Sequence, residues 1–276
     1  MISQSIKNQL EKDLELRAVL RASGAAFSAV LLTSTLSYFL GALVAIGVVV
    51  TTYVVGKKQN QKYQCTTQGA GLAAVAAFSL VTITFGSGIV GCFGRYALSL
   101  SVFHFTEYVF TAFSNRRSLR PDSFLLNHST AYWASASASW SYLFPSIKST
   151  NLSIIGFILC CIGEFIRKLG MVHAGTGFTH QLAMSKRPDH KLTTTGIYAY
   201  IRHPGYCGWY LWAVSTQLVL CNPVCVAVYT YVSWHFFAQR VYDEERDLLA
   251  FFGDAYSDYR QSVPSGIPFV TGYEPV

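Results

Sequence analysis

The chain has 276 residues and a formal net charge of +7, yet only 13% of its residues are charged and 51% are hydrophobic. A soluble globular protein carries roughly 25% charged residues, so this composition excludes that class and indicates an integral membrane protein. The seven cysteines are odd in number and include no C-x-x-C pair, which argues against a disulfide framework and a zinc site.

The first 21 residues mix charged side chains with Ile and Leu, and they lack the apolar run and small-residue cleavage site of a signal peptide. We therefore expect residues 1–21 to be a retained cytosolic segment that forms a surface helix.

Apolar stretches of membrane length follow. A helix crosses about 30 Å of hydrocarbon with roughly 20 residues. The apolar run from Ala22 to Val55 is too long for one span and is expected to turn near residues 38–41. Pro223 should end one helix and open the next, which divides the run 205–237 into a hairpin. The remaining candidate spans are residues 69–90, 96–113 and 154–171.

Segment 127–145 decides the number of spans. It is rich in Ser and Ala, which suit a helix packed against protein rather than lipid. If it crosses the membrane, both termini share a side, and of the 21 basic residues only Arg95 and Lys148 fall opposite. Because Lys and Arg concentrate in cytoplasmic loops, we predict an all-α membrane protein of about eight transmembrane helices with both termini in the cytosol. Residues 22–150 form its N-terminal transmembrane part.

Ionisable residues lie inside two predicted spans. Glu107 lies in the fourth, whereas Glu164 and Arg167 lie near the end of the sixth, three positions apart and so on one helix face. Charged side chains in a membrane are costly unless they are paired or face a polar cavity. We interpret Glu164 and Arg167 as site residues, with a structural ion pair as the alternative, and leave the role of Glu107 open.

A polar segment, T-G-I-Y-A-Y-I-R-H-P-G-Y-C-G, occupies residues 195–208 between apolar runs. Gly196 and Gly205 permit backbone conformations closed to other residues, and Pro204 biases the preceding residue toward an extended conformation. Such a turn presents backbone donors and acceptors to a ligand. The side chains that would suit an adenine or a ribose are Tyr198, Tyr200, Arg202, His203 and Tyr206. The alternative is an interfacial belt, because Tyr and Arg collect at membrane surfaces.

Arg240 and Glu244 stand four apart on a helix that should continue out of the last span, so both point the same way. One face thus offers a cation for a carboxylate and a carboxylate for a ribose or an amine. A solvated salt bridge is the alternative. The hairpin returns the chain to the side that it left, and can bring Glu244 beside His203.

Together these segments resemble the C-terminal signature of the isoprenylcysteine carboxyl methyltransferases. The matching elements are G-I-Y-A-Y-I-R-H-P-G-Y-C-G (196–208), L-C-N-P (220–223), D-E-E-R (243–246) and V-P-S-G-I-P-F (263–269). The R-H-P-x-Y-x-G part is shared with phospholipid methyltransferases and some sterol reductases, so L-C-N-P and V-P-S-G-I-P-F point to this family in particular. The resemblance is strong over the C-terminal part and only general over the first half.

The resemblance implies an enzyme of the endoplasmic reticulum membrane that methylates the C-terminal carboxylate of a prenylated cysteine, using S-adenosylmethionine. Its partners would be small GTPases and other CaaX proteins, together with membrane lipid, and no nucleic acid is expected. Residues 151–276 would form a cytosolic-side cofactor pocket and the catalytic region, with Arg240 near the substrate carboxylate. We add Arg167 and Glu164 to the catalytic set because they are ionisable residues inside a predicted span. The implied cofactor-binding residues are His190, Lys191, Leu192, Thr193, Tyr198, His203, Pro204, Gly205, Tyr206 and Glu244.

A carboxylate with a pKa of about 3.5 is already ionised at neutral pH, so no general base is needed and we expect catalysis by placement. Arg240 or Arg167 would hold the carboxylate through paired hydrogen bonds. One alternative is a phospholipid N-methyltransferase, whose amine nucleophile must first lose a proton. Another is a small-solute transporter, which would often show an internal repeat, and we find none between the halves.

Overall fold

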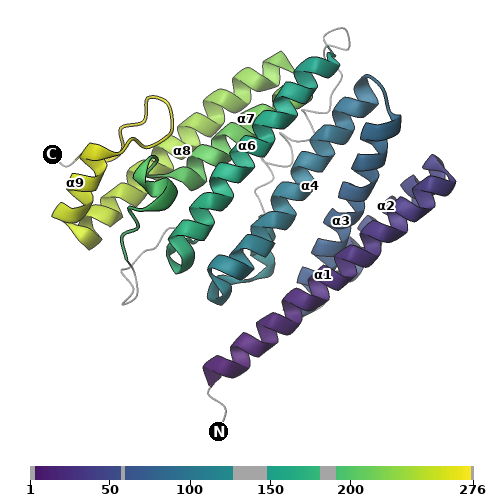
Figure 1. Cartoon of the computed structure of the whole chain (residues 1–276), viewed down its shortest axis with the longest axis horizontal. Coiled ribbons are helices and arrows are strands. Elements are labelled where there is room, and N and C mark those ends of the chain that lie inside the picture. The colour runs from purple at the N-terminus through teal and green to yellow at the C-terminus, as the bar shows by residue number, and fades with distance from the viewer. Residues whose placement is uncertain (1–3, 57–59, 127–147, 181–190, 275–276) are drawn as a thin grey trace.

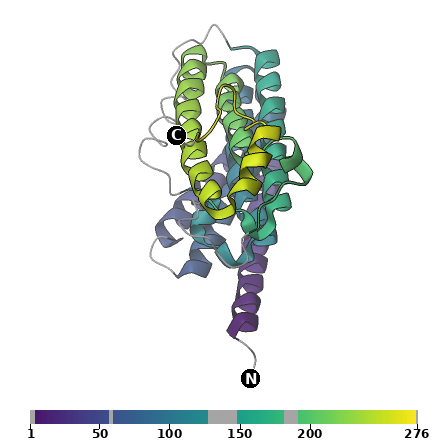
Figure 2. The same cartoon turned by 90° about the vertical axis from the view of Figure 1, so that its left-hand side faces the viewer.

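The computed structural model describes residues 4–56, 60–126, 148–180 and 191–274, and every regular element within these ranges is a helix. In Figures 1 and 2 the long helices lie side by side, from α1 and α2 at one edge to α7 and α8 at the other. The long helices are α1 (Gln4–Leu36), α2 (Tyr38–Gly56), α3 (Gln61–Phe85), α4 (Ile89–Ser114), α6 (Thr150–Ala174), α7 (Pro204–Val219) and α8 (Pro223–Phe252). The short elements are η1 (Arg116–Ser118), η2 (Pro121–Phe124), η4 (Gly175–Gly177), η5 (Gly196–Ala199) and α9 (Asp254–Ser262).

The two helix breaks predicted within apolar runs are confirmed. Helix α1 ends at Leu36 and α2 begins at Tyr38, close to the expected turn. The second break lies between α7 and α8, where the Asn222 side chain accepts a hydrogen bond from the amide of Cys225 at 3.1 Å. Pro223 then occupies the first turn of α8, where its missing N–H costs nothing. The hairpin therefore returns the chain to the end of the molecule that it left.

Two expectations concern the N-terminal half: that a surface helix covers residues 1–21, and that the chain has eight spans. Helix α1 is continuous from Gln4 to Leu36, so residue 21 does not end a helix; the sequence holds no proline there to break it. By length and composition, the described helices that could cross a membrane are Glu11–Leu36 and Gln61–Phe85. Segment 127–145 lies outside the described residues, so the count of eight spans stays a prediction.

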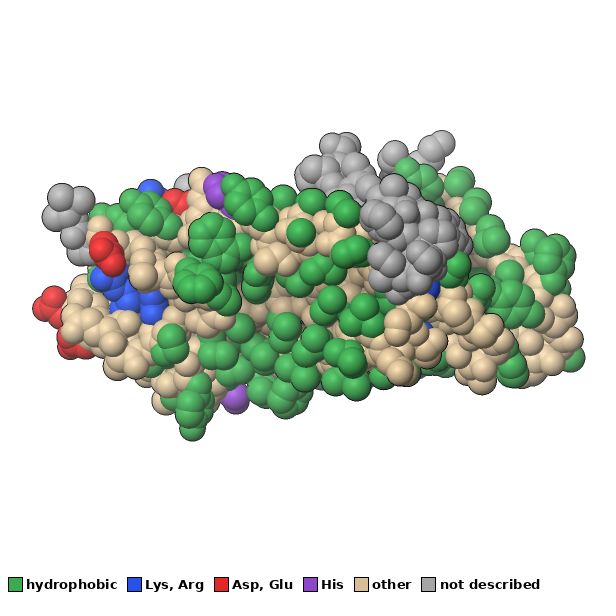
Figure 3. Space-filling view, turned by 90° about the horizontal axis from the view of Figure 1, so that it is seen from above, with side chains coloured by type: hydrophobic (Ala, Val, Ile, Leu, Met, Phe, Trp, Pro, Cys, Tyr) green, Lys and Arg blue, Asp and Glu red, His purple; other side chains and the backbone are tan. Residues whose placement is uncertain are grey.

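Large hydrophobic side chains cover much of the outer surface. On α2 the exposed residues Leu43, Ile46, Val50 and Val54 share one face, and α8 carries a similar row. Figure 3 shows hydrophobic side chains over the middle of the molecule, whereas most of the charged side chains on that face gather at the end that carries α9. Such a surface suits lipid around the middle and water at the charged end.

Helices α6 and α7 pack at backbone distance. A Cβ atom added to Gly163 would lie 2.6 Å from the carbonyl oxygen of Gly208 and 2.8 Å from the amide nitrogen of Trp212. Both neighbours are backbone atoms of α7 and cannot rotate away. A Cβ atom added to Gly208 would in turn lie 2.7 Å from the backbone nitrogen of Arg167, so the second turn of α7 is held against the part of α6 that carries Arg167.

We expect Gly163→Ala to destabilise the protein, because overpacking a tight contact costs about 1–3 kcal/mol. The measurement is the melting temperature of the purified protein in detergent. Gly24→Ala is the control, because nothing lies within 4 Å of a Cβ atom added there; it should melt no lower than the parent. Equal melting temperatures for the two variants would contradict the close packing of α6 on α7.

Candidate active site

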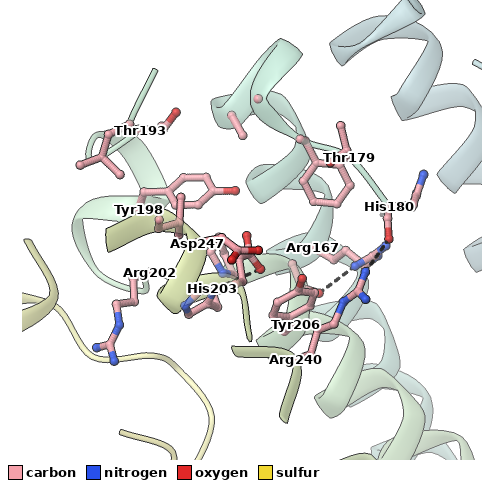
Figure 4. A pocket seen from close by; sticks show the side chains of 18 of the residues that line it. Arg167, Thr179, His180, Thr193, Tyr198, Arg202, His203, Tyr206, Arg240 and Asp247 are labelled. Carbon is pink, nitrogen blue, oxygen red and sulfur yellow. Dashed lines mark hydrogen bonds and ion pairs between the residues drawn. The ribbon is translucent and has the colours of Figure 1, made fainter. Parts of the chain in front are cut away.

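A cavity of about 300 Å³ lies among the loop before α7, the first turn of α7 and the C-terminal part of α8. In Figure 4, Tyr198, Tyr206 and Arg240 surround its centre, and Arg202 extends from its wall toward the C-terminal residues. The predicted site residues that line it are Arg167, Lys191, Leu192, Thr193, Tyr198, His203, Pro204, Gly205, Tyr206, Arg240 and Glu244. Segments far apart in sequence therefore meet at one cavity.

Two predicted residues stand apart from it. Glu164 is not among the lining residues; it is bound by the Thr106 hydroxyl and lies 3.2 Å from the Lys168 ammonium. His190 lies outside the described residues. The lining also includes side chains that the sequence motifs did not single out as site residues, among them Phe178, His180 and Trp209. Phe178 and His180 lie in the segment that follows η4, and Trp209 lies on α7 just after the polar segment 195–208, so only the folded arrangement brings them to the cavity.

The fully buried carboxylate of Glu107 organises one wall of the cavity. The Arg167 guanidinium donates to it through Nε at 2.5 Å and through Nη2 at 2.9 Å, and the Lys168 ammonium also binds it. A ring nitrogen of His180 lies 2.8 Å from its second oxygen. With Glu164, the cluster holds two carboxylates against two cations, so its charges balance when His180 is neutral.

Arg167 is held from every side. Besides Glu107, it donates to the carbonyl oxygen of Gly205 at 2.9 Å, and its guanidinium carbon lies 4.8 Å from the centre of the Trp209 ring and 5.5 Å from that of Phe178. An arginine bound in this way fixes the backbone of residues 195–208, which we call the polar turn. The structure therefore places Arg167 at the wall as a brace rather than as a free cation.

Arg240 and Glu244 lie on one face of α8 and both line the cavity, as their spacing predicts. Arg240 donates one hydrogen bond to the backbone oxygen of His180 at 3.0 Å, and Tyr206 interacts with both Arg240 and Glu244. One carboxylate oxygen of Glu244 is buried without a hydrogen-bond partner among the described residues, 3.8 Å from a ring nitrogen of His203. A buried acceptor without a donor is costly unless a ligand supplies one.

The neighbouring Glu245 does a different job, since adjacent helix positions point about 100° apart. Its fully buried carboxylate accepts hydrogen bonds from Arg202 at 2.6 Å, from His203 at 3.0 Å and from the backbone amide of Tyr273 at 3.1 Å. Gly272 lies directly against it, where any side chain would collide. Glu245 thus ties the polar turn and the chain end to α8.

The charge states at the cavity rim follow from these contacts. Burial would raise the pKa of the Glu245 carboxyl, but the hydrogen bonds from His203 and Arg202 hold that pKa below its usual value. Burial raises the pKa of the Tyr198 phenol, and the charge of Glu244 raises this pKa further. Burial also raises the pKa of Tyr259 to about 12. Both phenols stay protonated at neutral pH, and the Tyr259 hydroxyl donates to the Tyr198 carbonyl oxygen at 2.6 Å.

This arrangement can hold a ligand that carries both a flat ring and positive charge or hydroxyl groups. The rings of His203 and Tyr206 are stacked with their centroids 5.7 Å apart and offer flat faces. The carboxylate oxygen of Glu244 that lacks a hydrogen-bond partner offers an acceptor. Arg240 offers a guanidinium for an anion. Among the described residues, no group of three or more metal-ligating side chains lies together.

A model of the isoprenylcysteine carboxyl methyltransferase (ICMT) family matches residues 154–250. The chain is 46% identical to the protein-S-isoprenylcysteine O-methyltransferase of Xenopus laevis over 187 residues, which make up 65% of each chain. It is 43% identical to that of Rattus norvegicus over 199 residues, or 70% of each chain. These curated relatives are thus matched over about two thirds of their length.

The fold is also similar to a solved structure of the eukaryotic intramembrane Ras methyltransferase ICMT. The two share 33% sequence identity with a TM-score of 0.86, covering 95% of this chain and 99% of that chain. Since the likeness extends over almost the whole of both chains, the N-terminal helices belong to the same fold as the C-terminal signature.

We expect Glu107→Gln to lower the melting temperature strongly, because removing one partner of a buried ion pair costs about 3–5 kcal/mol. The double variant Glu107→Gln, Lys168→Met should recover part of the loss, since it restores the charge balance. Glu164→Gln is the control at the edge of the same cluster, where the side chain is 16% exposed, and should cost less. If Glu107→Gln melted like Glu164→Gln, the central role of Glu107 would be wrong.

The Glu245 network predicts a pH dependence of stability. A carboxyl group whose pKa is lowered by folding stabilises the protein above its unfolded pKa, and this contribution is lost as the pH falls through the folded value. The difference in melting temperature between the parent and Glu245→Gln should therefore be constant from neutral pH down to about pH 5 and shrink below about pH 4. Glu274→Gln, an exposed change near the chain end, should melt like the parent throughout. A difference that grew in acid would contradict this assignment.

Proposed function

The chain belongs to the isoprenylcysteine carboxyl methyltransferase family, a group of membrane enzymes that methylate the carboxyl group of a prenylated cysteine, and from this premise we propose how its cavity performs that reaction. The methyl donor is S-adenosylmethionine. The observation that carries the proposal is the position of Arg240 and Glu244, which face one cavity together with the polar turn. One face of α8 thereby offers a cation for the substrate carboxylate and an acceptor for the cofactor.

The residues present fit S-adenosylmethionine. When bound, it supplies an electrophilic methyl group on a positively charged sulfur. The buried oxygen of Glu244 that lacks a partner suits an amine or a ribose hydroxyl, and the faces of Tyr198, His203 and Tyr206 suit an adenine. Lys191, Leu192 and Thr193 close the same side of the cavity. His190 completes this predicted set by sequence position only.

The substrate carboxylate is assigned to Arg240. Arg167 and Arg240 both line the cavity, but Arg167 is already bound by Glu107 and the Gly205 carbonyl oxygen. Arg240 has one hydrogen bond to the His180 backbone and keeps further N–H groups for a carboxylate. We therefore give Arg167 and Glu164 positioning roles: Arg167 braces the turn, and Glu164 helps to hold Lys168.

Placement is the main task of these residues. The carboxylate is ionised at neutral pH, so no residue needs to remove a proton from it. Holding the carboxylate oxygen in line with the methyl group can contribute roughly 7–11 kcal/mol to lowering the barrier. Arg240 sets the position of the nucleophile, while the buried wall excludes water that would compete with it.

The membrane accounts for the shape of the site. A prenyl chain gains about 0.8 kcal/mol per buried CH2 group and stays in the bilayer. Phe236 lines the cavity and is 52% exposed on the outer face of α8, so the cavity reaches the lipid-facing surface there. We place the cofactor side in the cytosol, in an endoplasmic reticulum protein of eight spans with both termini cytosolic and with small GTPases among its substrates. The phospholipid methyltransferase and transporter alternatives gain no support from the family match.

The roles proposed for Arg240 and Glu244 can be tested separately. With S-adenosylmethionine and a farnesylated cysteine substrate, Arg240→Ala should lower kcat/KM at least about 100-fold, because misplaced reactants lose about that much. Its Kd for S-adenosylhomocysteine should stay close to that of the parent. Glu244→Ala should instead lose S-adenosylhomocysteine binding.

Arg246→Ala is the matched control for Arg240→Ala. Its side chain is 54% exposed and lies near Asp243 and Asp247 on the surface of the same helix, so its activity should be near normal. Near-normal activity of Arg240→Ala would contradict the role of Arg240 at the substrate carboxylate. Undisturbed S-adenosylhomocysteine binding by Glu244→Ala would contradict the role of Glu244 in cofactor binding.

A further inference from the structure

The element V-P-S-G-I-P-F at residues 263–269 is not explained by the cavity. We call residues 263–273, which follow α9, the C-terminal arm. Its first residues bind the polar turn: the amide of Arg202 donates to the Pro264 carbonyl oxygen at 3.0 Å, and that of His203 donates to the Ser265 carbonyl oxygen at 3.2 Å. The Arg202 guanidinium also binds the carbonyl oxygen of Val263. The start of the arm therefore has a structural role.

The middle of the arm is equally well fixed. Ile267 is buried in a cluster with Phe237 and Val241 of α8. The Trp234 indole N–H donates to the Pro268 carbonyl oxygen at 2.7 Å. The turn itself is closed by a hydrogen bond from the Val270 amide to the Ile267 carbonyl oxygen and by bonds of the Ser265 hydroxyl. The arm thus forms a hydrogen-bonded turn docked on α8.

Phe269 is the exception in this turn. Its side chain is 96% exposed, the most exposed of the large hydrophobic residues that the structure describes. Its backbone has φ of 62°, in the left-handed region that is rare for a bulky residue. Glycine would take this conformation without strain. A residue that is strained, aromatic and fully presented by a rigid turn calls for a function outside the chain's own core.

The residues around Phe269 indicate what its exposed side chain contacts. Trp234, which holds the turn, lies on α8 beside a row of exposed apolar residues, Val228, Tyr231, Val232 and Phe236. Along α8, Trp234 precedes Arg240 by six residues, which corresponds to about 9 Å at 1.5 Å per residue. The turn therefore lies nearer to the bilayer centre than the proposed carboxylate site. Trp side chains are typical of the boundary between lipid headgroups and acyl chains, and Phe side chains enter the same boundary from protein segments that lie in the interface.

We propose that the C-terminal arm is a membrane-contacting element and that Phe269 inserts from it into the boundary between headgroups and acyl chains. The arm suits such a place, because the carbonyl oxygens of Ile267, Pro268 and Val270, which flank the tip, accept hydrogen bonds from the Val270 amide, the Trp234 indole and the Ser265 hydroxyl. Its other end is bound to Glu245 through Tyr273. The arm thereby links the bilayer surface to the carboxylate that holds His203.

The full chain, reconstituted in phosphatidylcholine vesicles with or without brominated acyl chains, tests this proposal. Phe269→Trp adds one indole to the five native tryptophans, and the parent in the same vesicles provides the background. The added fluorescence should be largely lost in brominated lipid and be insensitive to iodide in the water. Ala255→Trp, at an exposed position of α9, is the matched control and should respond to iodide but not to bromine.

Two results would overturn the proposal. If the indole at 269 responds to iodide as strongly as the one at 255, the tip lies in water. If neither quencher reaches it, another protein surface or a second copy covers it.

A second variant keeps the test independent of folding. Phe269→Gly suits the positive φ, so in detergent it should melt no lower than the parent. In vesicles its arm should be cut faster by added protease, because the anchor is gone. Unchanged cleavage in vesicles would count against insertion. Methylation is not measured in these experiments, so their outcome is independent of the proposed reaction.

Discussion

The site depends on one buried carboxylate, that of Glu107. In a medium of low dielectric constant, a charge is tolerable only when its partners are close and complete, and here two cations and a histidine ring surround it. Two of these partners make further hydrogen bonds: Arg167 donates to the Gly205 carbonyl oxygen, and the backbone oxygen of His180 accepts from Arg240. The polar turn and the cation proposed for the substrate are thus positioned by the same electrostatic requirement.

Two neighbouring acidic residues of α8 have different roles. Glu244 keeps a buried oxygen without a partner beside the cavity, whereas Glu245 is fully satisfied by Arg202, His203 and the chain end. Glu244 is available to a ligand because Glu245 makes the hydrogen bonds that hold the polar turn. Glu245 thus holds the turn in place, while Glu244 leaves an acceptor free for the proposed cofactor.

Much of this could be predicted from the sequence, because the signals are local. The hairpin follows from Asn222 and Pro223, and the shared face of Arg240 and Glu244 follows from their spacing of four. The contact between Glu107 and Arg167 could not, since 60 positions separate them and no periodicity links residues on different helices. For the same reason the sequence left both Arg167 and Arg240 as candidates to hold the substrate carboxylate, since only packing reveals the hydrogen bonds of Arg167 to Glu107 and to the Gly205 carbonyl oxygen. The segment 127–145 and His190 stay predictions.

The position of Glu107 has a consequence for how the chain can vary. It comes from α4, whereas the family model begins at residue 154, so the recognisable signature does not contain the charge on which its own arginine rests. The N-terminal helices are therefore not an interchangeable anchor for a separable catalytic module. Because Glu107 is bound by Arg167 and Lys168 of the other half, we expect the two halves to vary together: a substitution at Glu107 should change what is tolerated at Lys168, and a half exchanged between relatives should be accepted only when its buried charge matches that of the other.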